Sequence, residues 1–395
     1  MGKLHDRRNS GERALEGESA MISFAKSTSR SARIGAAVAI GLLGVGLVSV
    51  YPFPARAGNV TLAETGSTLI NPLFKVWAAD YTKTHSGVTI SPAATNSVAG
   101  VEQAISGAVQ IGASDAYMSD GDVEQNPLII NVPMAISAQT VNYNIPGLNQ
   151  QNLKLSGPVL AGIYAGKIRA WDDPAIAALN PGTNLLHNDI APIHRSDPSG
   201  DTFVFTQYLT FSTEKWDSRI GFVSPESWQN RLGFGTTVAW PAISGASDAV
   251  GNAGMVEKIG ATPYSVGYVG VSFHDQIAKA GLGTAALQSY DGEFLLPTPQ
   301  SIEAAAAALW PRTPPDERLT LVNAPGANAY PLINYEYAVV SKKQPSPETV
   351  AALRSFLLWA IAPDETNAQY LANAHFIPLP AHVWVLSHDQ IEEIK

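Results

Sequence analysis

The amino-acid sequence predicts an α/β protein built around a largely parallel sheet. From residue 60 onward, short apolar stretches typical of strands alternate with stretches in which apolar residues recur at helical spacing. This is the order of elements in parallel sheets whose strands are joined by helices. The chain has 395 residues, of which 45% are hydrophobic and 15% charged, and this length suffices for about two or three domains with buried cores.

Three short strands are predicted near the start of the α/β region, at residues 60–63, 88–90 and 109–112. A helix is expected after each of the first two, because apolar residues there repeat every three or four positions. Pro72 falls in the first turn of the first helix, where its missing N–H group does little harm. The apolar faces consist of Ile70, Phe74, Trp77 and Tyr81 in the first helix, and of Val98, Val101, Ile105 and Ala108 in the second.

Further elements are predicted in the middle and C-terminal parts of the chain. A helix over residues 160–169 precedes a strand over 190–194, which runs into Arg195. Residues 301–310 form another helix, and the Ser-Pro-Glu sequence at 346–348 is typical of a capped helix start. The apolar faces are Phe203, Phe205, Tyr208 and Leu209 in a helix that begins near Ser199, and Val350, Leu353, Leu357 and Ile361 in the last helix.

Residues 1–57 carry the features of a secretory signal. Three basic residues between positions 22 and 33 precede an apolar run over 34–51, and Ala55-Arg56-Ala57 supplies the small residues that a signal peptidase requires. Met21 is a second candidate start, because the residues before it are polar and partly acidic. The run of 18 residues also reaches the shortest length that spans a bilayer. A cleaved signal peptide and an uncleaved membrane anchor therefore both stay open.

Charge and cysteine content restrict the class of protein further. Residues 1–57 contain 8 of the 25 basic and 4 of the 34 acidic residues, so the remainder carries 17 basic and 30 acidic side chains, a net charge of −13. A body this acidic repels nucleic acids and anionic lipid surfaces. A bound anion must therefore be held by local dipoles and not by a basic patch. The absence of cysteine excludes disulfides, thiolate metal sites and a lipid-modified cysteine.

Three loops place glycine and hydroxyl residues where a helix is predicted to begin. They cover residues 64–69, 95–100 and 195–202. The first turn of a helix presents unpaired backbone N–H groups and the positive end of the helix dipole, while Ser or Thr adds a donor. Each loop taken by itself is typical of ordinary helix capping. Together the three loops predict an anion site that needs no net positive charge.

Two charged groups give these loops more specific chemistry. Arg195 opens the third loop, where its guanidinium can hold an oxyanion through two hydrogen bonds, and Asp197 is placed to orient it. The alternative for this pair is a surface ion bridge of little energetic consequence. Asp115 follows a predicted strand, and ligands of open α/β sheets bind at the carboxyl ends of strands. A buried Asp115 accepts a proton that phosphate carries and sulfate lacks, whereas a capping Asp115 has no such role.

Motifs of common enzymes are incomplete. Gly112 to Ala116 misses the G-x-S-x-G motif of serine hydrolases by its last residue, and Gly162 to Lys167 has the wrong spacing for a P-loop. The eight histidines show no H-E-x-x-H spacing. We therefore expect no enzyme, no catalytic residues, no cofactor and no metal site. A secreted phosphatase and a receptor for another oxyanion, such as sulfate or molybdate, are the alternatives.

In the three loops and around Asp115 and Arg195, the sequence resembles the substrate-binding protein of the phosphate-specific ABC transporter. The resemblance covers nearly all of residues 58–390. Ser-Gly-Asp-Thr-Phe at 199–203 and Ile-Asn-Tyr-Glu-Tyr at 333–337 are most similar to the actinobacterial branch. The similar blocks are residues 61–77, 96–119, 142–172, 191–210, 233–238 and the closing strand 331–340.

The resemblance implies a two-lobed, Venus-flytrap fold of the periplasmic-binding-protein class, type II-like, with mixed sheets flanked by helices. Lobe 1 would comprise residues 58–134 and 327–395 and lobe 2 residues 135–326, with inorganic phosphate in the interlobe cleft. The implied partners are the transmembrane permease subunits, and the implied state is a monomer in the periplasm or at the cell surface. The lipobox cysteine of actinobacterial relatives is absent, so the protein is either free or held by an uncleaved N-terminal helix.

The resemblance also implies site residues. Two positions depart from the family pattern: Val98 stands where glycine or serine is common, and Asp201 stands where many members have a hydroxyl. We predict that Asp201 accepts a second phosphate proton and so favours the dihydrogen form. The residues that match phosphate-binding positions are Ser67, Thr68 and Leu69 in the first loop, Ser97 in the second, Asp115 as proton acceptor, Arg195 as clamp, Ser199 and Gly200 in the third loop, and Asp197 as the support of the arginine.

Overall fold

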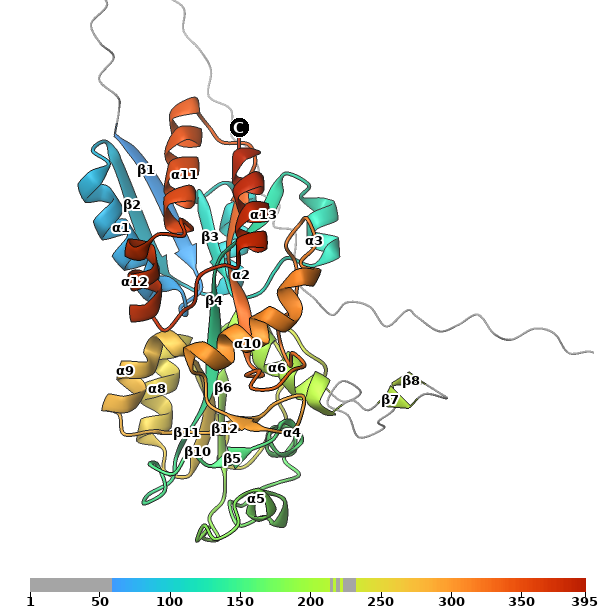
Figure 1. Cartoon of the computed structure of the whole chain (residues 1–395). Helices are drawn as coiled ribbons and strands as arrows, with labels where there is room; N and C mark the ends of the chain where they lie inside the picture. Colours follow the sequence, from blue (N-terminus) through green and yellow to red (C-terminus); the bar gives the residue numbers. More distant parts are fainter. Residues whose placement is uncertain (1–58, 214–215, 218–220, 223–231) are drawn as a thin grey trace, which may run out of the picture.

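The computed structural model describes residues 59–213, 216–217, 221–222 and 232–395 and shows two halves stacked one above the other (Figure 1). Among these residues, nine strands form one hydrogen-bonded ladder, in which eight follow the order β2-β1-β3-β14-β4-β10-β6-β9 and β11 pairs with β4. The bounds of these strands are β1 (Val60–Gly66), β2 (Val88–Ala94), β3 (Ile111–Ser114), β4 (Ile129–Asn144), β6 (Ala191–Arg195), β9 (Ser247–Ala249), β10 (Ser265–Gly270), β11 (Gly283–Thr284) and β14 (Ile333–Ser341).

Helices cover both halves of the ladder (Figure 1). The upper half carries α1 (Asn71–Thr84), α2 (Ser97–Ser106), α3 (Asp120–Gln125), α11 (Pro347–Ala360), α12 (Glu365–Asn373) and α13 (Ala381–Glu392). The lower half carries α4 (Gly157–Tyr164), α5 (Pro174–Leu179), α6 (Gly200–Thr213), α8 (Gly251–Ala261), the short helix η1 (Val271–Phe273) and α9 (His274–Lys279). Helix α10 (Pro299–Leu309) continues into η2 (Trp310–Arg312). Short strands outside the ladder are β5 (Lys154–Leu155), β12 (Ala286–Gln288) and β13 (Phe294–Leu295) in one sheet, and β7 (Trp216–Asp217) and β8 (Gly221–Phe222) in another.

The strand directions are mixed. The pairs β1–β2, β1–β3, β10–β6 and β6–β9 are parallel, whereas β14 pairs antiparallel with β3 and β4, and β10 pairs antiparallel with β4. The prediction of an α/β fold with mixed strand directions and flanking helices is confirmed. The largely parallel sheet expected from the order of elements is wrong for the centre of the ladder, where β4 and β14 pair antiparallel with their neighbours.

Strand β4 joins the two halves. Its first part, as far as Ala138, pairs with β14, and the part from Gln139 onward pairs with β10. The chain returns beside this point, where the Gln139 N–H donates to the Leu332 carbonyl at 2.9 Å. The lobe limits near residues 134 and 326 stay predictions.

The predicted apolar faces of α1 and α6 are buried. In α1, the side chains of Phe74, Trp77 and Tyr81 are at most 1% exposed, and the same holds for the predicted apolar face of α6. Ser346 caps α11 as predicted, since its Oγ accepts a hydrogen bond from the Thr349 N–H at 3.2 Å. Helical periodicity therefore identified the packed faces of α1 and α6 correctly. In α2, however, the predicted Val98 and Ile105 are only half-buried, and Ser97, Gly100, Val101 and Ala104 form the buried face.

Two helices are shorter than predicted. Helix α4 ends at Tyr164 and does not reach residue 169, because Gly166 adopts a φ of 71°, a left-handed conformation that stops a helix. Helix α2 ends at Ser106 for the same reason at Gly107, with a φ of 74°. Ala108 therefore lies beyond the helix and does not extend its apolar face.

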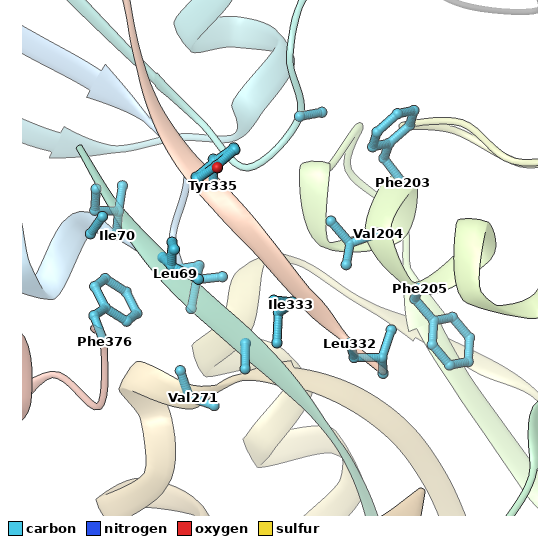
Figure 2. Close-up of a cluster of buried hydrophobic side chains, with 14 of the residues drawn as sticks. Leu69, Ile70, Phe203, Val204, Phe205, Val271, Leu332, Ile333, Tyr335 and Phe376 are labelled. Carbon is cyan, nitrogen blue, oxygen red and sulfur yellow. The ribbon is translucent and has the colours of Figure 1, made fainter. Parts of the chain in front are cut away.

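Apolar side chains form one continuous core through both halves. Figure 2 shows part of this core around the paired strands β4 and β14, with the labelled side chains of Leu69, Ile333 and Val271. All three side chains are at most 3% exposed. Leu69 also lies against Gly270, where a Cβ atom would be 2.1 Å from the Leu69 Cδ1 atom. The two halves are therefore in direct apolar contact next to the first loop.

The candidate signal or anchor segment, residues 1–57, lies outside the described residues. Among the helices that the structure does describe, none is both long and apolar enough to cross a membrane.

Glu317 offers a test of core electrostatics outside the three loops. Its side chain accepts hydrogen bonds from Ser387 Oγ at 2.8 Å and Gln390 Nε2 at 2.5 Å, and burial raises its pKa to about 8. The folded protein thus keeps this proton up to a higher pH than the unfolded chain does, so stability is lost as the pH rises from the ordinary carboxyl range through 8.

We expect Glu317→Gln, which mimics the neutral acid, to leave the free energy of unfolding unchanged near pH 4 to 5 and to raise it by up to about 4 kcal/mol at pH 8.5. Urea unfolding at both pH values measures this difference. Glu303→Gln on the exposed face of α10 is the matched control. Equal effects of the two substitutions at pH 8.5 would contradict the prediction.

Candidate anion-binding site

The first two site residues follow neighbouring strands. Strands β1 and β3 are parallel, with Gly66 paired to Ala113, so the residues after their carboxyl ends lie side by side. Ser67 Oγ donates a hydrogen bond to Asp115 Oδ1 and accepts one from the Leu69 N–H at 3.0 Å. Ser67 therefore both caps the turn that leads into α1 and contacts the carboxylate. Asp115 is 3% exposed, so the alternative of a solvated Asp115 is wrong.

The second and third loops meet at the same carboxylate. Ser97, the first residue of α2, donates from Oγ to Asp115 Oδ2 at 3.1 Å. The Gly200 N–H at the start of α6 donates to Ser97 Oγ at 3.1 Å. This approach requires glycine, because a Cβ at position 200 would lie 2.7 Å from the Asp115 Cβ and 2.8 Å from Asp115 Oδ2.

Arg195 lies at the end of β6 between two carboxylates. Its Nε donates to Asp197 Oδ1 at 2.6 Å, its Nη2 donates to Asp197 Oδ2, and its Nη1 donates to Asp201 Oδ2 at 2.6 Å. The guanidinium side chain is 1% exposed. The pair with Asp197 is therefore a buried, bidentate support, and the alternative of a surface ion bridge is wrong. Ser199 Oγ reaches Asp201 Oδ2 at 3.5 Å.

Asn252, near the start of α8, connects the first and third loops across the two halves. Its Nδ2 donates to Thr68 Oγ1 at 2.9 Å and to Asp201 Oδ2 at 2.8 Å, and its backbone N–H also donates to Thr68 Oγ1 at 3.1 Å. Its Oδ1 accepts from the Gly270 N–H at 2.7 Å. Leu69 contributes a second link, since its carbonyl accepts from Ser272 Oγ at 2.6 Å.

The electrostatics of the cluster favour protons on carboxyl groups. Burial, followed by the Asp115 charge, raises the pKa of Asp201 to about 7, although Arg195 opposes the shift. Burial also raises the pKa of Asp115, against the effect of its hydrogen bonds. Glu336 of β14 is next to Asp115, and burial together with the Asp115 charge raises its pKa well above the ordinary value. Because Ser67 and Ser97 both donate to Asp115, Asp115 is the carboxylate of this pair and Glu336 holds the proton.

This arrangement suits an oxyanion that brings its own protons. Arg195, the serine hydroxyls and the backbone N–H groups at the start of α6 are donors. Asp115, and Asp201 when it is ionised, are acceptors within the same buried cluster. A fully deprotonated anion would meet at least the Asp115 carboxylate with no proton between them, whereas a protonated anion donates to it.

The structure brings together every residue that the sequence predicted for the site. Ser67, Ser97, Asp115 and Gly200 are joined by hydrogen bonds. The third loop adds Arg195, Asp197, Ser199 and Asp201, and Asn252 links Thr68 to this loop. Leu69 adjoins the cluster through its backbone.

Sequence reasoning missed Asn252, Gln139 and Glu336. Gln139 Nε2 donates to Asp201 Oδ1 at 3.1 Å. A signal existed for each: Gly251-Asn252 repeats the glycine-polar pattern of the three loops at a helix start, and Gln139 and Glu336 are polar residues within strands that also carry many apolar ones.

Asn252→Ala tests the link between the halves. The substitution removes donors to Thr68 and Asp201 and leaves the Gly270 N–H without its acceptor. We expect the Kd for phosphate to rise by roughly 10- to 100-fold, which corresponds to about 1–3 kcal/mol. Isothermal titration calorimetry measures the change, and Asn373→Ala on an exposed position is the matched control. A Kd within twofold of the unmodified protein would exclude this role.

The chain is similar to known phosphate-binding proteins over most of its length. The "Phosphate-binding protein PstS" of Methanocaldococcus jannaschii is 32% identical over 361 residues, which cover 86% of this chain and 88% of that protein. That of Pasteurella multocida is 32% identical over 337 residues, covering 85% and 91%. "Phosphate-binding protein PstS 3" of Mycobacterium leprae is 27% identical over 339 residues. This mycobacterial relative is less similar to the chain than the two proteins above. The assignment of the chain to the actinobacterial branch therefore stays a prediction.

Solved structures share the fold. A high-affinity periplasmic phosphate-binding protein bound with phosphate at pH 8.5 (PfluDING) gives a TM-score of 0.63 at 18% identity and covers 82% of this chain and 92% of that one. The phosphate-binding protein from Stenotrophomonas maltophilia gives a TM-score of 0.59 at 19% identity, covering 84% and 93%. At these identities the likeness concerns the fold, and it confirms the predicted periplasmic-binding-protein class.

A family model also matches residues 54–364 and is described as the PBP superfamily domain. On the strength of this match and of the identities above, the chain belongs to the PBP superfamily and, within it, to the family of PstS phosphate-binding proteins.

Proposed function

We propose that this protein binds inorganic phosphate outside the cytoplasm and delivers it to the permease of an ABC importer. The observation that carries the proposal is the buried cluster in which Arg195, Asp115 and Asp201 meet at three loop ends. Its donors and acceptors match an oxyanion that carries protons. Membership of the PstS family and the phosphate bound by a protein of the same fold support the same ligand.

Each site residue has a proposed role. Arg195, steadied by Asp197, pairs with two phosphate oxygens. Asp115 and Asp201 accept phosphate protons. The remaining phosphate contacts are hydroxyl and backbone N–H donors from the three loops: Ser67, Thr68, Leu69, Ser97, Ser199 and Gly200.

Binding and release require the two halves to separate. In the described conformation, Thr68 and Leu69 of the upper half are bonded to Asn252 and Ser272 of the lower half. Phosphate would enter when these bonds open about the crossings at β4 and β14. The proposed form is a monomer in the periplasm or at the cell surface, either free or attached by residues 34–51.

One set of measurements tests the function. The purified chain is titrated with phosphate and with sulfate by calorimetry, and phosphomonoester hydrolysis is assayed in parallel. We expect tight phosphate binding, no competition from sulfate and no turnover. Turnover would favour the phosphatase alternative, and equal sulfate affinity would favour a receptor for another oxyanion.

Asp201→Asn tests whether the site recognises a second phosphate proton through Asp201. If Asp201 accepts a phosphate proton, the unmodified protein prefers dihydrogen phosphate, and its affinity falls about tenfold for each pH unit above the pKa of that proton. The Asn variant retains an oxygen for Arg195, and its amide can donate to the unpaired Gln139 Oε1. We expect its affinity to stay constant between pH 7 and 9, with Asp248→Asn as the exposed control. An unchanged pH profile in Asp201→Asn would refute the second proton acceptor.

A further inference from the structure

Three side chains with metal-ligand atoms converge at the boundary between the two halves. His274 and Asp275 are the first residues of α9 in the lower half, and His375 follows α12 of the upper half. The three offer two imidazole nitrogens and one carboxylate oxygen, all within 4.8 Å of one another. Figure 1 shows α12 and its following segment directly above α8 and α9.

The geometry suits a divalent transition metal. The rings of His274 and His375 have centroids 4.5 Å apart, and His274 Nδ1 lies 3.5 Å from Asp275 Oδ1. Ligand atoms around a tetrahedral zinc ion, at about 2.0–2.1 Å from the metal, lie about 3.3 Å from each other. The His274 and Asp275 side chains are 62% and 93% exposed, so rotation about their side-chain bonds can close the remaining gap. Two histidines and one carboxylate leave the fourth position to water.

A cavity provides an approach to this cluster. It has a volume of about 270 Å³ and is lined by both histidines together with Thr140, Val271 and Thr298. The acidic body, with its excess of carboxylates, also raises the local concentration of cations.

Each side of the cluster is fastened to a different half. His375 precedes Ile377, whose N–H donates to the Ile136 carbonyl of β4 at 2.9 Å. His274 follows the segment Gly270–Ser272, which is bonded to Asn252 and to Leu69 at the candidate anion site. A metal ion shared by His274 and His375 would therefore restrain the separation of the halves.

We propose that His274, Asp275 and His375 form a binding site for a divalent transition metal such as Zn²⁺, which bridges the two halves and stabilises their closed arrangement. Sequence spacing does not reveal this site, because the two histidines are about a hundred residues apart in the chain. The metal site stands independently of the proposed function, whereas its effect on phosphate release rests on that function.

The first experiment measures metal binding without phosphate. The full chain is titrated with Zn²⁺ by calorimetry and with Co²⁺ by visible absorption, which reports tetrahedral coordination. We expect one ion per chain, and we expect His274→Ala and His375→Ala each to weaken binding more than about tenfold. His388→Ala is the matched control, because His388 also lies beside an aspartate: its Nδ1 is 3.6 Å from Asp389 Oδ1. Binding that none of the site variants weakens, or no binding at all, overturns the proposal.

The second experiment tests whether a bound metal ion holds the two halves together. Phosphate release is followed by stopped flow with and without Zn²⁺ in the unmodified chain and in His375→Ala. We expect Zn²⁺ to slow release in the unmodified chain and to have no effect in the variant. If Zn²⁺ binds at these residues but release is unchanged, the bridging role is wrong. If phosphate does not bind at all, the proposed function fails while the Zn²⁺ titration still decides the metal site.

Discussion

Arg195→Met is expected to reduce phosphate binding by roughly 30- to 3,000-fold, which corresponds to about 2–5 kcal/mol of binding free energy. The guanidinium is the buried cation that the structure places between Asp197 and Asp201. Its removal takes away the bidentate oxyanion donor and leaves carboxylates to repel phosphate. Calorimetric titration with phosphate measures the loss.

The same substitution also affects folding, so a second variant is needed. Uncompensated buried carboxylates destabilise a protein by about 3–5 kcal/mol, and urea unfolding of the ligand-free variant measures this cost. Arg195→Lys keeps the charge but loses the planar fork, so we expect an intermediate loss of affinity. Arg312→Met at an exposed position is the control. If folded Arg195→Met binds phosphate within about threefold of the unmodified protein, Arg195 is not the clamp.

Asp115→Asn is expected to change specificity more than affinity. The carboxylate is held by Ser67 and Ser97 in a buried position, where sulfate would meet a charge without a proton. The Asn amide donates where Asp115 can only accept. We expect the preference for phosphate over sulfate to fall by roughly 10- to 150-fold, or about 1.5–3 kcal/mol. Competitive titration of phosphate against sulfate measures the ratio.

A matched pair of controls makes the result for Asp115 specific. Asp389→Asn at an exposed position should leave the ratio unchanged. Glu336→Gln replaces the neighbouring protonated acid by a neutral amide, so it should lower sulfate discrimination far less than Asp115→Asn does. If Asp115→Asn keeps the full preference for phosphate over sulfate, a group other than Asp115 recognises the phosphate proton.

The local features of the site were predictable because they depend on short stretches of chain. Residues 64–69 and 195–202 each combine a strand end, small polar residues and a helix start, and these patterns are set by backbone geometry over a few residues. The burial of Phe74, Trp77 and Tyr81 followed from helical spacing in the same way. The ends of α2 and α4 were misjudged although Gly107 and Gly166 mark them, because apolar residues continue beyond both glycines.

The partners of these features were not predictable, because they come from distant parts of the chain. Thr68 and Asn252 are 184 residues apart, and the carbonyl of Asp115 accepts from Asn334 at a separation of 219 residues. Such pairs depend on the strand order, in which β14 lies between β3 and β4. Nothing in the sequence near Asp115 indicates that Glu336 will lie beside it.

The sequence alone predicted the candidate site residues, which are Arg195 with its support Asp197, the acids Asp115 and Asp201, and three loops of donors, in a chain too acidic to bind an anion by net charge. The tertiary structure alone decided that these groups meet, that Arg195 and Asp115 are buried, and that Asn252, Gln139 and Glu336 complete the cluster. Backbone conformation and capping are encoded within a few residues, whereas burial and the pKa of Asp201 arise from contacts that exist only after the two halves have packed together.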